Sequence, residues 1–235
     1  MILRDEARFR NDQPGGPVTA TFTVAFDWNG TLVDDADRAR LAASAVLVRR
    51  GLPALDAGGF HEGFCLPLAR WFSILGIESR DLAGAVREWN EEVRNRPAEL
   101  AAGSLQTIRA LRLLGARLGV VSAAEAAAVR KDLDHVGLAE LVDFVVGGAD
   151  PKRDALRDLA ASSPGGVAYI GDTEYDILEA KAAGAWAIGY GDGYRPAAAL
   201  AAAGADFVID RLSELPDLLT RLRDRPLGAD GDAGR

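Results

Sequence analysis

Short apolar runs alternate with segments of helical periodicity through most of this chain, and this alternation is the feature that most limits how it can fold. The apolar runs are too short for helices and have the continuous apolar character of strands buried on both faces. They lie at Phe22–Phe26, Leu118–Val121, Phe144–Val146, Val167–Ile170, Trp186–Ile188 and Phe207–Ile209. The helical segments lie at Leu105–Leu114, Ala124–Asp134, Arg153–Ala161, Asp176–Ala183, Ala197–Ala203 and Leu212–Leu222. Alternating strands and helices build right-handed crossovers, so the sequence predicts an α/β fold around an open parallel sheet.

One interval, residues 35–102, departs from this alternation. It contains no convincing strand, and its helical patterns lie at Asp35–Arg50, Leu66–Leu75 and Asp81–Asn95. We interpret it as a helical insertion after the first strand, which divides the α/β core into residues 18–34 and 103–225. Residues 1–17 and 226–235 are rich in Pro, Gly and Asp and lack apolar periodicity, so we expect a disordered leader and a disordered tail.

The charge and composition exclude several classes of function. Acidic residues number 35 against 27 basic ones, and the net charge of −8 opposes binding to nucleic acids and to anionic membranes. No apolar run is long enough to cross a bilayer, and the N-terminal segment has charges where a signal peptide needs its apolar region. We therefore expect a cytoplasmic protein. One cysteine, Cys65, and two histidines provide no zinc site, so any bound metal must be held by oxygen.

Polar residues at the ends of the predicted strands are the candidates for chemistry, because ligands of open α/β sheets bind beyond the carboxyl ends of the strands. Asp27 follows the first strand, Ser122 the second and Asp172 the fourth, while Lys152 follows the third, just before the helical segment Arg153–Ala161. Each of them, taken alone, is also explained as a helix cap or a solvated charge. Together, Asp27, Asp172 and Asp176 offer hard oxygen ligands for Mg²⁺, and Ser122 and Lys152 are suited to bind a phosphoryl group.

The motifs FDWNGTLVDD, GVVS, PK and GDTEYD, with EAKAAGA after the last, resemble in their order those of the haloacid dehalogenase superfamily. The resemblance covers the whole predicted folded region. It implies a Rossmann-like parallel-sheet core with an inserted helical cap, as in phosphoglycolate-phosphatase-like members, and places residues 35–102 where the family has that cap. The activity it implies is Mg²⁺-dependent hydrolysis of a small phosphorylated metabolite.

The resemblance also assigns roles to individual residues. It implies that Asp27 is a nucleophile that becomes an aspartyl phosphate, and that the main-chain carbonyl of Asn29 helps to hold Mg²⁺. The phosphate-binding positions match Ser122 and Lys152, the acidic metal-site pair matches Asp172 and Asp176, and Thr31 in the first motif is assigned to substrate binding.

Asn29 departs from the pattern of most family phosphatases, which have a second aspartate at this position. That aspartate protonates the leaving oxygen and then activates water, whereas an amide cannot exchange the proton. General acid–base catalysis typically contributes ~10²–10⁴-fold, so its loss matters most for alkyl phosphates and less for acyl phosphates and phosphoanhydrides. Three alternatives stay open: a hydrolase in which Asn29 hydrogen-bonds a good leaving group or orients water, a phosphotransferase, and a non-catalytic protein that binds phosphorylated ligands.

The insertion contains one candidate for substrate recognition. The segment His61–Phe72 combines aromatic side chains with Arg70, as a lid facing an anionic substrate would. The alternative is that its apolar residues form the core of a helix and that Arg70 is solvated. The loop Tyr190–Arg195 stays outside the predicted site, because Gly-rich turns usually reflect backbone geometry. The sequence leaves the oligomeric state open.

Overall fold

Six parallel strands form one sheet, in the order β3-β2-β1-β4-β5-β6, in the computed structural model, which describes residues 22–223. The strands are β1 (Thr23–Phe26), β2 (Arg117–Val121), β3 (Phe144–Val146), β4 (Val167–Gly171), β5 (Trp186–Tyr190) and β6 (Phe207–Ile209). Phe26, the last residue of β1, aligns with Val120 of β2 and Ile170 of β4. The chain adds strands on one side of β1 and then on the other, so the crevice of this open sheet lies beside the end of β1. The predicted α/β fold and its parallel sheet are confirmed.

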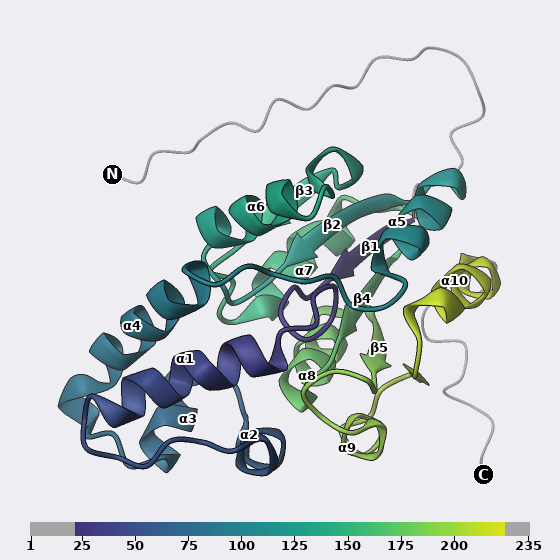
Figure 1. Cartoon of the computed structure of the whole chain (residues 1–235). Coiled ribbons are helices and arrows are strands. Elements are labelled where there is room, and N and C mark those ends of the chain that lie inside the picture. The colour runs from purple at the N-terminus through teal and green to yellow at the C-terminus, as the bar shows by residue number, and fades with distance from the viewer. Residues whose placement is uncertain (1–21, 224–235) are drawn as a thin grey trace, which may run out of the picture.

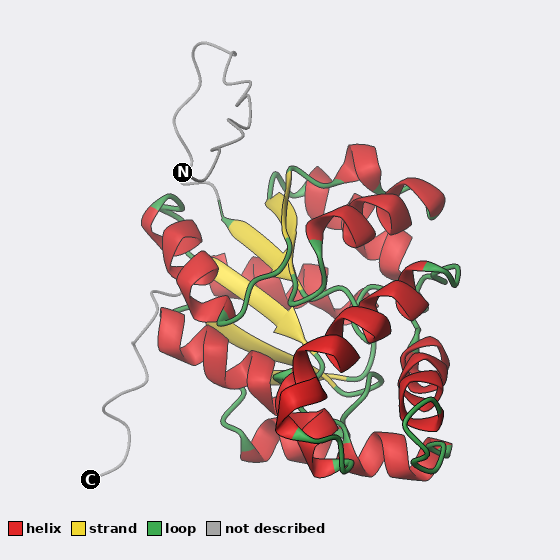
Figure 2. Ribbon diagram, turned by 90° about the vertical axis from the view of Figure 1, so that its left-hand side faces the viewer, coloured by secondary structure: helices red, strands yellow, loops and turns green. Residues whose placement is uncertain are grey.

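Helices cover both faces of the sheet (Figure 2), because successive side chains of a strand point to opposite faces. Val24 and Phe26 pack in the cluster that contains apolar residues of α5, α6 and α10, whereas Ala25 packs in the cluster of α7, α8 and α9. These helices are α5 (Ser104–Leu113), α6 (Ala126–His135), α7 (Lys152–Ala161), α8 (Glu174–Ala183), α9 (Ala197–Ala202) and α10 (Leu215–Arg223). The four central strands are buried on both sides, as their continuous apolar character predicts, whereas the edge strands β3 and β6 are only partly buried.

The insertion after β1 consists of helices that group together to one side of the sheet (Figure 1). They are α1 (Ala36–Val48), α2 (Ala57–Gly63), α3 (Leu68–Ile74) and α4 (Leu82–Arg94), with a 3₁₀ turn at Ser79–Asp81. They have an apolar cluster of their own, in which Phe60, Trp71, Phe72 and Trp89 are buried. Tyr194, from the loop after β5, is the residue of the α/β core that joins this cluster.

Two segments differ from the sequence expectations. Helix α2 was not predicted, because its glycines lower helix propensity. In the structure Asp56 caps the start of this helix, and its carboxylate accepts a hydrogen bond from Gly59 N at 2.7 Å. The predicted helix Leu212–Leu222 is divided into a 3₁₀ turn, Leu212–Glu214, and α10. The leader predicted at 1–17 and the tail predicted at 226–235 lie outside the described residues.

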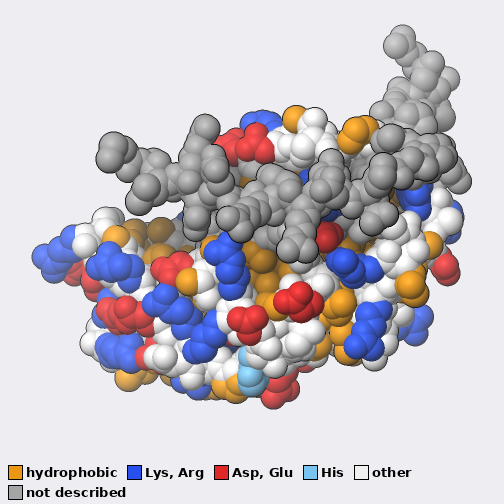
Figure 3. Space-filling model, turned by 90° about the horizontal axis from the view of Figure 1, so that it is seen from above, with side chains coloured by type: hydrophobic (Ala, Val, Ile, Leu, Met, Phe, Trp, Pro, Cys, Tyr) orange, Lys and Arg blue, Asp and Glu red, His pale blue; other side chains and the backbone are white. Residues whose placement is uncertain are grey.

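The described surface mixes charges of both signs. On the face drawn in Figure 3, Lys and Arg side chains are interspersed with Asp and Glu rather than gathered in a stripe. None of the helices within residues 22–223 combines the length and the apolar character needed to span a membrane.

Candidate active site

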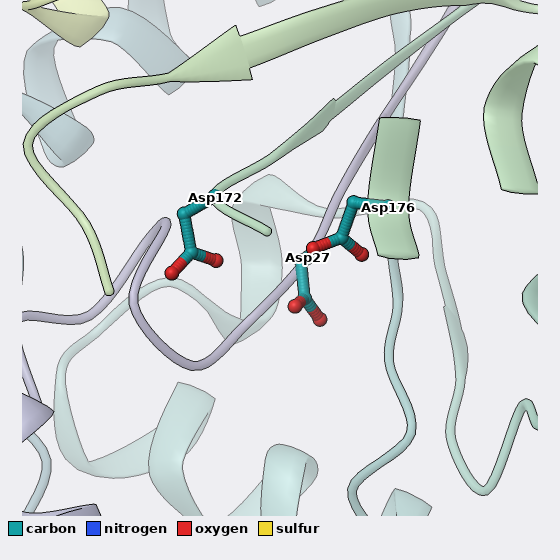
Figure 4. A group of neighbouring side chains, drawn as sticks. All are labelled: Asp27, Asp172 and Asp176. Atoms are coloured by element: carbon teal, nitrogen blue, oxygen red, sulfur yellow. The ribbon is translucent and has the colours of Figure 1, made fainter. Parts of the chain in front are cut away.

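Three buried aspartates converge beyond the carboxyl ends of the central strands. Asp27 comes directly after β1, Asp172 directly after β4, and Asp176 lies in the first turn of α8. One carboxylate oxygen from each lies within 4.8 Å of the others, and Figure 4 shows the three side chains gathered there. The adjacent places of β1 and β4 in the sheet produce this convergence, as the positions of the aspartates after the apolar runs predicted.

The start of α8 fixes the position of Asp176. Thr173 is the N-cap of this helix: its hydroxyl donates to Asp176 Oδ2 at 2.6 Å and its main-chain N–H donates to the same oxygen at 3.1 Å. The other oxygen, Oδ1, accepts from Tyr169 Oη at 3.1 Å. Gly171 leaves room for this arrangement, because a Cβ there would lie 2.4 Å from Asp176 Cβ. The capping interaction with Thr173 therefore orients the carboxylate of Asp176 toward Asp27.

Lys152 is the cation of the site. It is the first residue of α7, its side chain is fully buried, and its Nζ lies 3.0 Å from Asp27 Oδ2 and 2.6 Å from Asp176 Oδ1. A buried ammonium is stable only with such partners. The position of one of the chain's few lysines between two of the predicted aspartates is consistent with a role in screening them from an incoming phosphate.

Burial and mutual repulsion shift the proton affinities of this cluster. Burial raises the pKa of Asp27 to about 6, although the charge of Lys152 opposes the shift. The pKa of Asp172 is raised well above its ordinary value, first by burial and then by the charges of Asp176 and Asp27. For Lys152, burial lowers the pKa, but Asp176 and Asp27 outweigh it and raise the pKa above its usual range. The cluster thus holds more negative charge than one lysine balances.

Replacing Lys152 by Met is expected to lower the free energy of unfolding by about 3–5 kcal/mol at pH 8, because it leaves two buried carboxylates without their cation. Lowering the pH to 5 should restore part of this loss, since Asp27, whose pKa burial raises to about 6 even beside Lys152, then takes up a proton. Urea unfolding at the two pH values measures both effects.

The matched control for this variant is Lys181→Met. Lys181 forms an ion pair with Asp206 but its side chain is 47% exposed, so we expect a change below about 1 kcal/mol. Equal losses in the two variants would contradict a structural role of Lys152 as the counter-charge of the cluster.

Asp172 is held from the side opposite to Lys152. Thr31 Oγ1 donates to its Oδ1 at 2.9 Å, and the main-chain N–H of Tyr194 donates to its Oδ2 at 2.8 Å. The backbone can come this close to Asp172 only with glycine at positions 30 and 193, because a Cβ on either residue would lie within 2.3 Å of an Asp172 atom. Gly30 also has a φ of +76°, which favours glycine. Thr31, which the resemblance assigned to the substrate, therefore contacts a carboxylate of the site.

Asn29 and Asp35 form a contact that the sequence interpretation did not include. Asn29 Nδ2 donates to Asp35 Oδ2 at 2.5 Å, while Asp35 Oδ1 accepts from Gly30 N at 2.9 Å and from Tyr194 Oη at 2.7 Å. Asp35 is 3% exposed, and burial raises its pKa. Asp35 was missed because we interpreted this residue only as the start of the insertion. Tyr194 was missed because this residue lies in the Gly-rich loop after β5, which we placed outside the predicted site. The strand-end rule alone would have included that loop.

A cavity lies between Asp27 and the inserted helices. Its polar lining comes from Asp27, Asn29, Ser122 and Thr173. The inserted helices and their loops contribute Phe64, Leu66, Leu68 and Trp89, and Tyr194, Ala123 and Ala124 complete the lining. Ser122 is 2% exposed and its hydroxyl accepts from Ala124 N at 3.2 Å. Arg70 lies on α3, is exposed, and is absent from this lining, so the structure does not bring it to the other predicted site residues.

Buried and half-buried contacts join the insertion to the core around this cavity. Arg38 of α1 lies 2.8 Å from Asp132 of α6, whose Oδ2 also accepts from Trp28 Nε1 at 3.3 Å. Arg195 pairs with Glu174 at 2.8 Å and donates to main-chain carbonyls at the end of α2. The inserted helices are thus fixed above the ends of the strands that carry the aspartates.

Comparisons with known proteins agree with this geometry. A curated protein named a probable phosphatase IndB, from Dickeya dadantii, is 30% identical over 82% of this chain and 90% of its own length. A phosphoglycolate phosphatase from Cereibacter sphaeroides is 32% identical over 85% of this chain and 98% of its own. The crystal structure of a predicted phosphatase from Clostridium acetobutylicum superposes with a TM-score of 0.76 at 22% identity, covering 86% of this chain and 99% of that one.

The family model of haloacid dehalogenase-like hydrolases matches residues 24–190, which include β1 from Val24 on, the inserted helices, and every residue predicted for the site. The fold, the order of the motifs and the relatives therefore lead to one assignment. The chain belongs to the haloacid dehalogenase-like hydrolase family.

Proposed function

We propose that this protein is a Mg²⁺-dependent phosphatase that hydrolyses a small phosphorylated metabolite through an aspartyl phosphate on Asp27, with the helices of residues 35–102 as its cap. The observation that carries the proposal is the placement of Asp27: its carboxylate borders the cavity while Lys152 and two further carboxylates surround it. The relatives named as phosphatases support hydrolysis as the reaction, in preference to transfer or to binding alone.

The acidic cluster fits a divalent cation. Asp27, Asp172 and Asp176 present hard oxygen atoms close together, and the raised pKa values of Asp27 and Asp172 indicate negative charge that Lys152 does not neutralise. These residues, with the main-chain carbonyl of Asn29, would hold Mg²⁺. When bound, Mg²⁺ supplies positive charge to the phosphoryl oxygens and lowers their repulsion with Asp27.

The residues of the chain then have distinct tasks. An oxygen of Asp27 forms a bond to phosphorus while the bond from phosphorus to the leaving oxygen breaks, and the leaving oxygen keeps the electron pair. Lys152 and Ser122 are placed to stabilise the phosphoryl oxygens in this step. Water next attacks phosphorus, which releases phosphate and restores the Asp27 carboxylate. Asn29 has no acidic proton to deliver, so its part is to orient water or the leaving group through its amide.

We expect Mg²⁺ to raise the melting temperature at pH 8 much more than at pH 5. A ligand present at ~100 times its Kd stabilises by ~2.7 kcal/mol, or roughly 5–10 °C for a chain of this size. At pH 5 protons compete for the ligands, since the pKa of Asp27 is about 6 and that of Asp172 is also raised. Without Mg²⁺, the stability of the fold should instead fall as the pH rises. A carboxyl group whose pKa is higher in the folded state than in the unfolded state destabilises the fold as the pH rises through that pKa.

Differential scanning calorimetry with and without Mg²⁺ measures the rise in melting temperature at each pH. The rate of phosphate release should also depend on Mg²⁺. Asp172→Asn is expected to lose most of the Mg²⁺-induced shift, whereas Asp134→Asn, at an exposed position on α6, should keep it. A shift of equal size at both pH values, or one retained by Asp172→Asn, would contradict the proposed metal site.

A further inference from the structure

The cap side of the cavity is apolar. Phe64 and Trp89 are buried, and Leu66 and Leu68 are half-buried beside them. The cavity has a volume of about 30 Å³, which favours a small leaving group. With the phosphoryl group at Asp27, the rest of a substrate extends toward these four side chains.

The cations near the cavity are already engaged. Lys152 is bound by Asp27 and Asp176, and Arg195 by Glu174 and two carbonyls. Arg38 pairs with Asp132 and does not line the cavity, although its Nη2 is buried without a partner. No lysine or arginine of residues 22–223 lines the cavity. A second anionic group on the substrate, such as a carboxylate, would be desolvated there without a counter-charge.

The polar side of the cavity restricts the leaving group in a second way. The Asn29 amide donates one Nδ2 hydrogen to Asp35, which leaves its second N–H and Oδ1 for other partners. That N–H can hydrogen-bond a leaving oxygen, but an amide does not transfer a proton to it. The leaving oxygen must therefore be one that departs without a proton, which a phenolate does far more readily than an alkoxide.

We propose that the substrate of this site is a small aryl phosphate, with an uncharged ring against Phe64, Leu66, Leu68 and Trp89. This inference rests on the proposed function and deepens it by naming the substrate class. Asp27 forms its bond to phosphorus as the bond to the phenolic oxygen breaks, and the phenolate keeps the electron pair. The water that later releases phosphate supplies the hydroxyl that remains on phosphorus and the proton that the phenolate takes up.

Three substrates separate the two requirements, which are an uncharged ring and a leaving oxygen that departs without a proton. Phenyl phosphate meets both requirements. 4-Carboxyphenyl phosphate adds a charge to the ring while improving the leaving group, and benzyl phosphate keeps an apolar ring but its leaving group is an alkoxide. We expect kcat/KM for phenyl phosphate to exceed each of the others by about tenfold or more. Equal values for phenyl and 4-carboxyphenyl phosphate would overturn the inference and leave the proposed function standing. Absence of Mg²⁺-dependent release from all three and from acetyl phosphate would overturn both.

A cap variant tests the position of the ring. Leu68→Arg places a cation in the lining and should reverse the preference in favour of 4-carboxyphenyl phosphate. Ile74→Arg adds the same charge to the same helix at a side chain that is 64% exposed, so it should keep the wild-type preference. If both variants keep that preference, the ring does not meet Leu68 and the inference fails.

Binding to the wild-type protein gives a measurement that does not depend on how Leu68→Arg folds. With Mg²⁺ present, calorimetric titration should give a Kd for phenylphosphonate about tenfold or more below that for phosphonoacetate, because the second anion of phosphonoacetate has no counter-charge. Tighter binding of phosphonoacetate would overturn the inference.

Discussion

Replacing Asp27 by Asn is expected to lower the rate of phosphate release at saturating Mg²⁺ by ~10³-fold or more. An amide is nearly the same size as a carboxylate but is a far weaker nucleophile, so the cavity persists while the attacking group is lost. Burial raises the pKa of Asp27, so removing its charge should not destabilise the fold. Release from phenyl phosphate and acetyl phosphate, with melting temperature as the check on folding, measures the effect.

The matched control is Asp34→Asn, which changes an exposed aspartate on the same loop and should leave turnover within about twofold. Mass spectrometry of the acid-quenched wild type should detect a phosphoryl adduct on Asp27 that the Asp27→Asn variant lacks. An Asp27→Asn variant that retains a tenth of wild-type turnover would show that another group, or water directly, attacks phosphorus.

The sheet was predictable because its central strands, such as β4 and β5, are buried along their whole length and are therefore apolar. The edge strands Phe144–Val146 and Phe207–Ile209 are only partly buried, but they are apolar too and have the predicted bounds. Once parallel strands are inferred, their ends must meet at one edge, and this geometry brought Asp27 and Asp172 together before any contact was known. Lys152 followed from the same rule, since it begins the helix after the third strand.

Other parts of the molecule were not predictable, for physical reasons that differ from case to case. Helix α2 depends on tertiary packing of Phe60 against aromatic neighbours rather than on the propensity of its residues. Tyr194 binds Asp172 through its main-chain N–H, an interaction that any residue except proline can make and that no side-chain pattern reveals. Which cap side chains line the cavity depends on how the inserted helices pack above the sheet.

The contact between Asn29 and Asp35 changes the meaning of the departure from the family motif. Judged from the sequence alone, Asn29 replaces the aspartate that most family phosphatases have at this position, and the site therefore lacks an acid. In the structure, a carboxylate is present next to it, but Asp35 is buried and fully engaged with Asn29, Gly30 and Tyr194. The carboxylate therefore positions the amide, while the group that lines the cavity is Asn29.

Restoring aspartate at position 29 alone would place two carboxylates in hydrogen-bond contact. One of them must then take up a proton, and that proton is held between the two side chains rather than delivered to a substrate. We therefore expect Asn29→Asp to lower the free energy of unfolding and to gain little activity. Adding Asp35→Asn removes the repulsion, because the new amide donates to the new carboxylate.

The double variant Asn29→Asp/Asp35→Asn is accordingly expected to raise kcat/KM for benzyl phosphate by ~10²–10⁴-fold, since it places an ionisable acid where the alkoxide leaves. The gain for phenyl phosphate should be much smaller, because a phenolate departs without a proton, and the pH profile for benzyl phosphate should acquire a limb that the wild type lacks. Asp35→Asn alone serves as the control and should show no gain. A folded double variant without increased benzyl phosphate turnover would mean that position 29 does not face the leaving oxygen, and that the selectivity for good leaving groups must come from the apolar cap.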